Sequence, residues 1–191
     1  MIEDIKNSEI ISKNDEATIK EFLESFDLRV VKIDSKRNIN KTPDFGVESS
    51  EGFYFYCEVK SIDSDMNEAI LHNTKLNKLE RKIINSYEKF VSVNKNHFAP
   101  NVICFLSNDF RINSNSLEEY FKGYIDISVE KLDTRKHRDG NAFDAVRNID
   151  LFIWYADINH VRYFINRIEN RFVNKFISLF KIESIKENMK L

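Results

Sequence analysis

The sequence has few of the residues that interrupt regular structure and few that cross-link it. Its 191 residues include only 4 Gly, 2 Pro and 2 Cys. So little Gly and Pro excludes collagen-like and low-complexity chains. The two cysteines lie in the apolar runs FYFYC and VICFL and are expected to be buried free thiols. No apolar run approaches the roughly 20 residues of a membrane span, and the acidic start MIEDIKNSEI does not resemble a signal peptide. We therefore expect a soluble, cytoplasmic protein with no membrane partner.

Core-forming residues are abundant. The chain is 42% hydrophobic and contains 16 Phe and 7 Tyr, which excludes disorder as its overall state. The length suits a single domain over residues 1–191. The formal net charge of −2 argues against a strongly basic, histone-like nucleic-acid binder.

Hydrophobic periodicity predicts the order helix, three strands, helix, strand over the first 106 residues. Helical spacing marks 15–26 and a long segment whose apolar face runs from Ala69 to Phe90. Aromatic and β-branched runs predict strands at 28–33, 44–47, 53–62 and 102–106. Further along, the pattern predicts a helix at 116–124, a strand at 124–129, an irregular charged stretch at 131–148, a strand at 150–156 and a terminal helix from His160 onward.

Residues with chemical potential gather on the predicted strand 53–62. Alternation places Tyr54, Tyr56, Glu58 and Lys60 on the face opposite the apolar side chains. A turn at 49–52 folds the preceding strand back alongside, which brings Asp44 level with the Glu58–Lys60 end. Two carboxylates converging at one end of a sheet suit Mg²⁺ or Mn²⁺. A lysine beside them can position a water or stabilise charge on a phosphoryl oxygen.

Pro43-Asp44 and Glu58-Val59-Lys60, set in this order of elements, resemble the PD-(D/E)xK nuclease superfamily over about residues 14–106. The resemblance implies an α/β fold with a mixed central β-sheet flanked by helices. Its restriction-endonuclease-like core (α-β-β-β-α-β) would be followed by a C-terminal strand and helix extension over about 107–191. It also implies that Asp44 and Glu58 bind the metal, that the Val59 carbonyl assists, and that Lys60 helps the attacking water.

Many members of this superfamily also carry a metal-binding Glu on the first helix. Glu16, Glu21 and Glu24 compete for that role in this chain. A projection at 100° per residue places Glu16 nearest the apolar face, so Glu16 is preferred as a third ligand.

The function expected on this resemblance is cleavage of nucleic acid by a Mg²⁺- or Mn²⁺-dependent endonuclease, with DNA as the expected substrate. Restriction, repair, recombination and defence are all compatible settings. The alternative is a non-catalytic module that uses the same fold to bind nucleic acid or a protein, and the sequence pI of about 6.1 is compatible with it. Because a duplex has two strands, a homodimer is compatible with the activity.

Two groups of basic residues are candidates for contacts with the phosphate backbone. One is a stripe on the long helix, away from its apolar face, and the other is in a predicted loop; the residues are Lys75, Lys78, Lys82 and Lys89 on the helix, and Arg135, Lys136 and Arg138 in the loop. An ordinary solvated surface is the alternative for both groups. Tyr54 and Tyr56 either pack under a helix or stack on a base.

Overall fold

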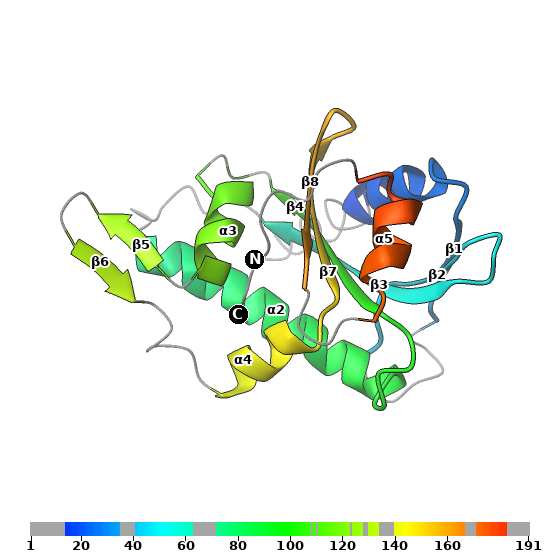
Figure 1. The fold of residues 1–191 in the computed structure, drawn as a ribbon, viewed down its shortest axis with the longest axis horizontal. Coiled ribbons are helices and arrows are strands. Elements are labelled where there is room, and N and C mark those ends of the chain that lie inside the picture. The colour runs from blue at the N-terminus through cyan, green and yellow to red at the C-terminus, as the bar shows by residue number, and fades with distance from the viewer. Residues whose placement is uncertain are drawn as a thin grey trace, which may run out of the picture.

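A six-stranded sheet divides the computed structural model (Figure 1) into two halves. The structure describes residues 14–34, 41–62, 72–107, 109, 111–122, 124–127, 130–133, 140–166 and 171–182. The strand order is β1-β2-β3-β4-β7-β8. The strands are β1 Arg29–Lys32, β2 Phe45–Glu48, β3 Tyr54–Ile62, β4 Asn101–Ser107, β7 Leu151–Asp157 and β8 His160–Ile165.

The sheet is mixed, as predicted. β1, β2 and β3 form an antiparallel meander, β4 and β7 run parallel to β3, and β8 is antiparallel to β7. The turn between β2 and β3 contains Gly52 at a φ of 78°, a backbone conformation that favours glycine. The parallel pair β3–β4 needs a long crossover, which includes helix α2 (His72–Val93).

Helices cover both faces of the sheet. The helix over residues 14–24 and α5 (Val173–Leu179) pack on one face, where Leu23, Phe55 and Phe176 are fully buried. α2, α3 (Ser114–Lys122) and α4 (Gly140–Arg147) pack on the other face, around Ile83, Phe105 and other buried residues. A separate two-stranded sheet, β5 (Tyr124–Ile127) with β6 (Glu130–Asp133), lies at the left of Figure 1. The predicted α/β class is therefore confirmed.

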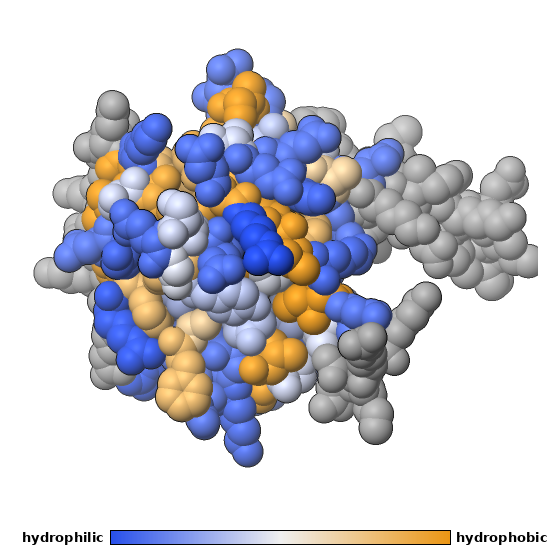
Figure 2. Space-filling model, turned by 90° about the vertical axis from the view of Figure 1, so that its right-hand side faces the viewer, coloured by the Kyte–Doolittle hydropathy of each residue, from blue (hydrophilic) through white to orange (hydrophobic). Residues whose placement is uncertain are grey.

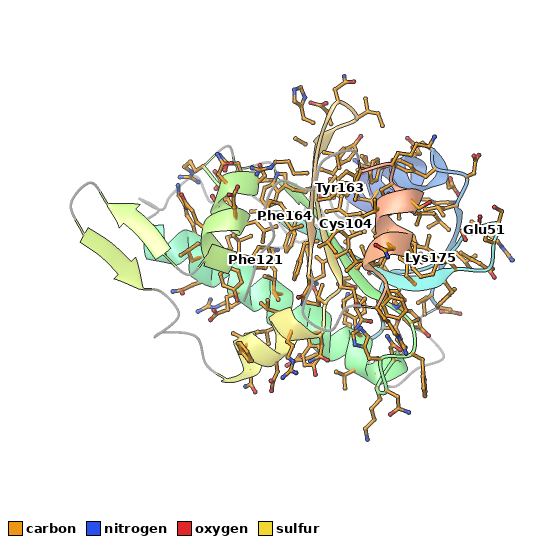
Figure 3. The ribbon with its side chains drawn as sticks, in the orientation of Figure 1. Glu51, Cys104, Phe121, Tyr163, Phe164 and Lys175 are labelled. Carbon is orange, nitrogen blue, oxygen red and sulfur yellow. The ribbon has the colours of Figure 1, made fainter. Side chains whose placement is uncertain are left out.

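The face with the 14–24 helix and α5 is turned toward the viewer in Figure 2, where hydrophobic residues lie among predominantly hydrophilic ones. Lys175 of α5 forms an exposed ion pair at 3.6 Å with Glu51 in the β2–β3 turn (Figure 3). None of the described helices is long and apolar enough to cross a membrane.

The two cysteines lie side by side in the core beneath this face. Cys57 on β3 and Cys104 on β4 are both fully buried free thiols, as predicted, with their Sγ atoms 3.6 Å apart. The hydrogen bond between the thiols, together with burial, raises the pKa of Cys57 well above its usual range. The Cys57 thiol is therefore held in the protonated, unreactive form.

The prediction of a helix from His160 onward was wrong for residues 160–165, which form strand β8. The side chain of Asp157 accepts a hydrogen bond from the Asn159 N–H at 2.8 Å and stabilises a tight turn that returns the chain alongside β7. Tyr163 packs against Phe180 on the α5 side, whereas Phe164 packs against Phe121 of α3 on the other side (Figure 3). This alternation shows a strand that contributes to both cores.

The stretch 131–148 was predicted to be irregular, which was also wrong in part. Strand β6 covers Glu130–Asp133 and helix α4 covers Gly140–Arg147. Ala145 and Val146 of α4 are buried against the α2 side of the core. The high density of charged residues in this stretch concealed the short apolar face of α4.

Candidate active site

Asp44 lies where β2 and β3 separate. The last residue pair between these strands is Phe45 with Cys57. Beyond it, the backbone carbonyl of Asp44 stays with β1 and accepts a hydrogen bond from the Ile33 N–H at 2.9 Å. Its side chain reaches β3, where Oδ2 accepts a hydrogen bond from the Val59 N–H at 2.8 Å. The Asp44 carboxylate thus accepts the hydrogen bond that a backbone carbonyl would accept from Val59 within a strand pair, and it is fixed beside Glu58.

Glu58 is a charged group held almost entirely out of water. Its side chain is 1% exposed, and Oε1 receives two ammonium groups, Lys60 Nζ at 2.6 Å and Lys89 Nζ at 2.5 Å. The second oxygen, Oε2, is buried and has no hydrogen-bond partner. A buried polar atom without a partner costs free energy unless something else binds it.

Burial, and then the negative charge of Asp44, raise the pKa of Glu58 to about 7, although both lysines act to lower it. Burial of the Lys89 amine acts to lower its pKa, but the charges and hydrogen bonds of Glu58 and Asp44 outweigh that effect and raise it. The two shifts differ in origin, because burial is the main cause of the raised pKa of Glu58, whereas the neighbouring carboxylates raise the pKa of Lys89.

Lys89 comes from α2 and completes the site. Its Nζ also lies 3.6 Å from Asp44 Oδ1, so one ammonium contacts both carboxylates. Ser92, one turn further along α2, donates a hydrogen bond to the carbonyl of Lys41 at 2.8 Å. This contact ties the end of α2 to the segment that leads into Asp44, and it places Lys89 over the site.

Lys89 was predicted to lie in the lysine stripe away from the apolar face of the helix, but its ammonium contacts the buried Glu58 instead. The structure explains its position, because Lys89 follows Ser86 by three residues and directly precedes Phe90. Both neighbours are fully buried, and positions three apart share a helix face. The other members of the stripe, Lys75, Lys78 and Lys82, are half-buried.

Glu16, the preferred third ligand, is less exposed than Glu21 and Glu24, as the projection indicated. Its carboxylate forms an ion pair with the ammonium of Lys32 on β1. In the part of the chain that the structure describes, no group of three or more His, Cys, Asp or Glu side chains is placed to hold a metal ion. A role for Glu16 at the site stays a prediction.

Several other candidate residues can now be placed. The rings of Tyr54 and Tyr56 pack edge to face at 5.1 Å. Tyr56 contacts the core on the α2 side, as the packing interpretation predicts, whereas Tyr54 is exposed. Tyr54 covers Gly46 so closely that a Cβ there would overlap its hydroxyl. Arg135, Lys136 and Arg138 lie outside the described residues.

A polar pocket of about 250 Å³ lies away from Asp44 and Glu58, between α2 and α3. It is lined by Lys75, Arg111, Ser116 and Glu119, among others. It therefore adjoins the lysine stripe and not the carboxylates.

Comparisons with models of protein families, with curated proteins and with solved structures find no match to this chain.

Proposed function

We propose that this chain is a metal-dependent nuclease with a restriction-endonuclease-like fold that hydrolyses phosphodiester bonds in DNA. The observation that carries the proposal is the meeting of three motif side chains. Asp44 directly precedes β2, Glu58 and Lys60 lie on the neighbouring strand β3, and both carboxylates contact the ammonium of Lys89. A solvated Glu–Lys pair on a strand surface would not bury the Glu to 1% exposure.

The order of elements also supports the proposal. A helix, three antiparallel strands, a helix and a parallel strand follow one another from residue 14 to Ser107. The Asp stands at the start of the second strand and the Glu and Lys within the third, as in the superfamily that the motif resembles.

The residues present fit a divalent cation. Glu58 Oε2 is a buried oxygen without a hydrogen-bond partner. The other oxygen of Glu58, Oε1, shares the ammonium of Lys89 with the Asp44 carboxylate. Hard oxygen ligands of this kind are those that Mg²⁺ and Mn²⁺ prefer. Asp44 and Glu58 would hold the ion, with the Val59 carbonyl and Glu16 as further candidate ligands. When bound, such an ion lowers the pKa of a water and offsets charge on a phosphate.

Each protein group then has a definite task. The Val59 N–H fixes the orientation of Asp44 through the hydrogen bond to Oδ2. Lys60 is anchored by Glu58 Oε1 while its side chain remains 15% exposed, so its ammonium can donate a hydrogen bond to a water or to a phosphate oxygen. Fixed donors of this kind favour the transition state because they need no reorganisation when charge develops.

The experiment that tests the function is plasmid cleavage by the purified chain in Mg²⁺ or Mn²⁺, with EDTA as the comparison. We expect cleavage with the metal and none with EDTA. Asp44→Asn and Glu58→Gln should each abolish cleavage, and Glu51→Gln, an exposed position in the β2–β3 turn, should not. DNA binding without cleavage by the wild type under every metal condition would instead support the non-catalytic binding module.

A further inference from the structure

The position between the two candidate metal ligands is already held by a positive charge. Lys89 Nζ lies 2.5 Å from Glu58 Oε1 and 3.6 Å from Asp44 Oδ1. Lys60 Nζ contacts Glu58 at 2.6 Å, and no contact with Asp44 is seen for it. Lys89 is therefore the lysine that bridges the pair, as a shared cation would.

When Glu58 is ionised, the charges of this cluster balance in the absence of metal. Two carboxylates, Asp44 and Glu58, face two ammonium groups, Lys60 and Lys89. A divalent cation added to all four would leave two excess positive charges in a site where Glu58 is 1% exposed and Lys89 is 21% exposed. Like charges repel strongly where little water screens them, so one ammonium must leave for the ion to bind well.

Lys89 is the group placed to leave. Its side chain extends from the surface of α2, on a separate element from both carboxylates, and has four rotatable bonds with which to reach water. Lys60 shares strand β3 with Glu58, so its backbone remains beside the site in any rotamer.

We propose that Lys89 is a built-in competitor for the divalent cation, holding the place between Asp44 and Glu58 until the ion displaces it. This inference rests on the proposed function, because it assigns Lys89 to the regulation of that same site. Lys89 lowers the metal affinity and keeps the buried carboxylates neutralised in the metal-free protein. Its effect on the cation is indirect, because it acts through its contacts with Asp44 and Glu58.

The test is Mn²⁺ binding by the full-length chain, measured by isothermal titration calorimetry without any nucleic acid. Lys89→Met keeps most of the length of the side chain and removes its charge, and it should bind Mn²⁺ about tenfold more tightly than the wild type. Lys89→Arg keeps the charge and should bind no more tightly. Lys95→Met removes an exposed charge just beyond α2 and should leave the affinity unchanged.

Lys89→Gln is a second uncharged variant that keeps a polar group at this position, so the test does not depend on the folding of the Met variant alone. Folding is checked by far-UV circular dichroism. Equal or weaker Mn²⁺ binding by the folded Met or Gln variant overturns the inference. If Asp44→Asn still abolishes Mn²⁺ binding in that case, the metal site itself survives. If neither the wild type nor the Lys89 variants bind Mn²⁺, or if Asp44→Asn binds as the wild type does, the proposed site fails and the inference fails with it.

Discussion

Lys60 and Lys89 contact the same oxygen of Glu58, yet the structure gives them different surroundings. Lys60 is on the strand that carries the Glu, and among the described residues its ion pair is with Glu58. Lys89 spans both carboxylates from a helix. Loss of Lys60 should therefore affect the reaction, whereas loss of Lys89 should affect the binding of the cation.

For Lys60→Ala we expect the rate of plasmid cleavage to fall by about 10²- to 10⁴-fold, the usual contribution of a positioned donor or acid–base group. The fold and Mn²⁺ binding should be retained, since Asp44 and Glu58 remain. Lys60→Arg should not restore the rate, because a planar guanidinium differs in shape from an ammonium and does not give up its proton. Initial rates at saturating Mg²⁺ provide the measurement, with Lys95→Ala as the control. Cleavage by Lys60→Ala at the wild-type rate would disprove the mechanism.

Glu58 should make the stability of the metal-free protein depend on pH. Its folded-state pKa of about 7 lies above the ordinary value of 4.5. Between these values the folded state keeps a proton that the unfolded state has lost, so the free energy of unfolding falls as pH rises. From pH 5 to pH 7.5 the contribution of Glu58 should fall by roughly 2 kcal/mol.

Urea unfolding in EDTA at pH 5 and pH 7.5 measures this effect. Glu58→Gln has no proton to lose at this position, so its loss of stability over the same interval should be smaller by that amount. An equal loss in the two proteins would show that the Glu58 carboxyl titrates at its ordinary pKa.

At the scale of a single element, α2 has two tasks. Its C-terminal part carries Lys89 into the site, and its N-terminal part carries Lys75, Lys78 and Lys82. These three lysines span about 10 Å along the helix axis. If they follow a phosphate backbone, each releases about one counterion when DNA binds.

Replacing Lys75, Lys78 and Lys82 together by Gln should reduce the slope of log affinity against log salt by about 2 to 3. Fluorescence anisotropy with a labelled duplex in EDTA, over a series of KCl concentrations, measures the slope without cleavage. A triple Gln variant of Lys20, Lys95 and Lys175, which are exposed elsewhere, controls for net charge. Equal slopes for the two triple variants would favour the solvated-surface interpretation of the stripe.

Some of the strands could be predicted from the sequence alone and others could not. The strands that carry Asp44 and Glu58 were predictable, because local propensity and burial agree there. β8 was not, because Val161 and Ile165 satisfy both helical spacing and strand alternation. The turn at Asp157 and the pairing with β7 determine that this segment forms a strand and not a helix.

The motif residues Asp44, Glu58 and Lys60 could be predicted from their spacing and their place in the order of elements. Lys89 could not be assigned in this way, since a lysine at the edge of an apolar face can point to water or to the sheet. Its direction is set by tertiary contacts, among them the hydrogen bond from Ser92 to Lys41.

At the scale of the whole molecule, the sheet joins two hydrophobic cores. Phe176 is fully buried in the core beside α5, and Phe121 is 3% exposed in the core beside α2. Both cores use opposite faces of the same strands, so we expect the described sheet to unfold in one cooperative transition.

Phe176→Ala and Phe121→Ala should each lower the free energy of unfolding by about 3 to 5 kcal/mol, and Lys175→Ala by less than about 0.5 kcal/mol. Trp154, the single tryptophan, is buried in the core beside α2. Its fluorescence should therefore report the loss caused by Phe176→Ala in the opposite core. A tryptophan transition that Phe176→Ala leaves unchanged would mean that the two cores unfold separately.

The buried thiols of Cys57 and Cys104 allow the opening of the centre of this sheet to be measured by thiol labelling. An alkylating reagent reacts with thiolate, so it must wait until β3 and β4 part and expose the sulfurs. The labelling rate then measures how often β3 separates from β4. β3 also carries Glu58, which directly follows Cys57 in the chain. An ion that stabilises the closed strand would slow the labelling, so the two native cysteines offer an occupancy assay for the site that needs no substrate.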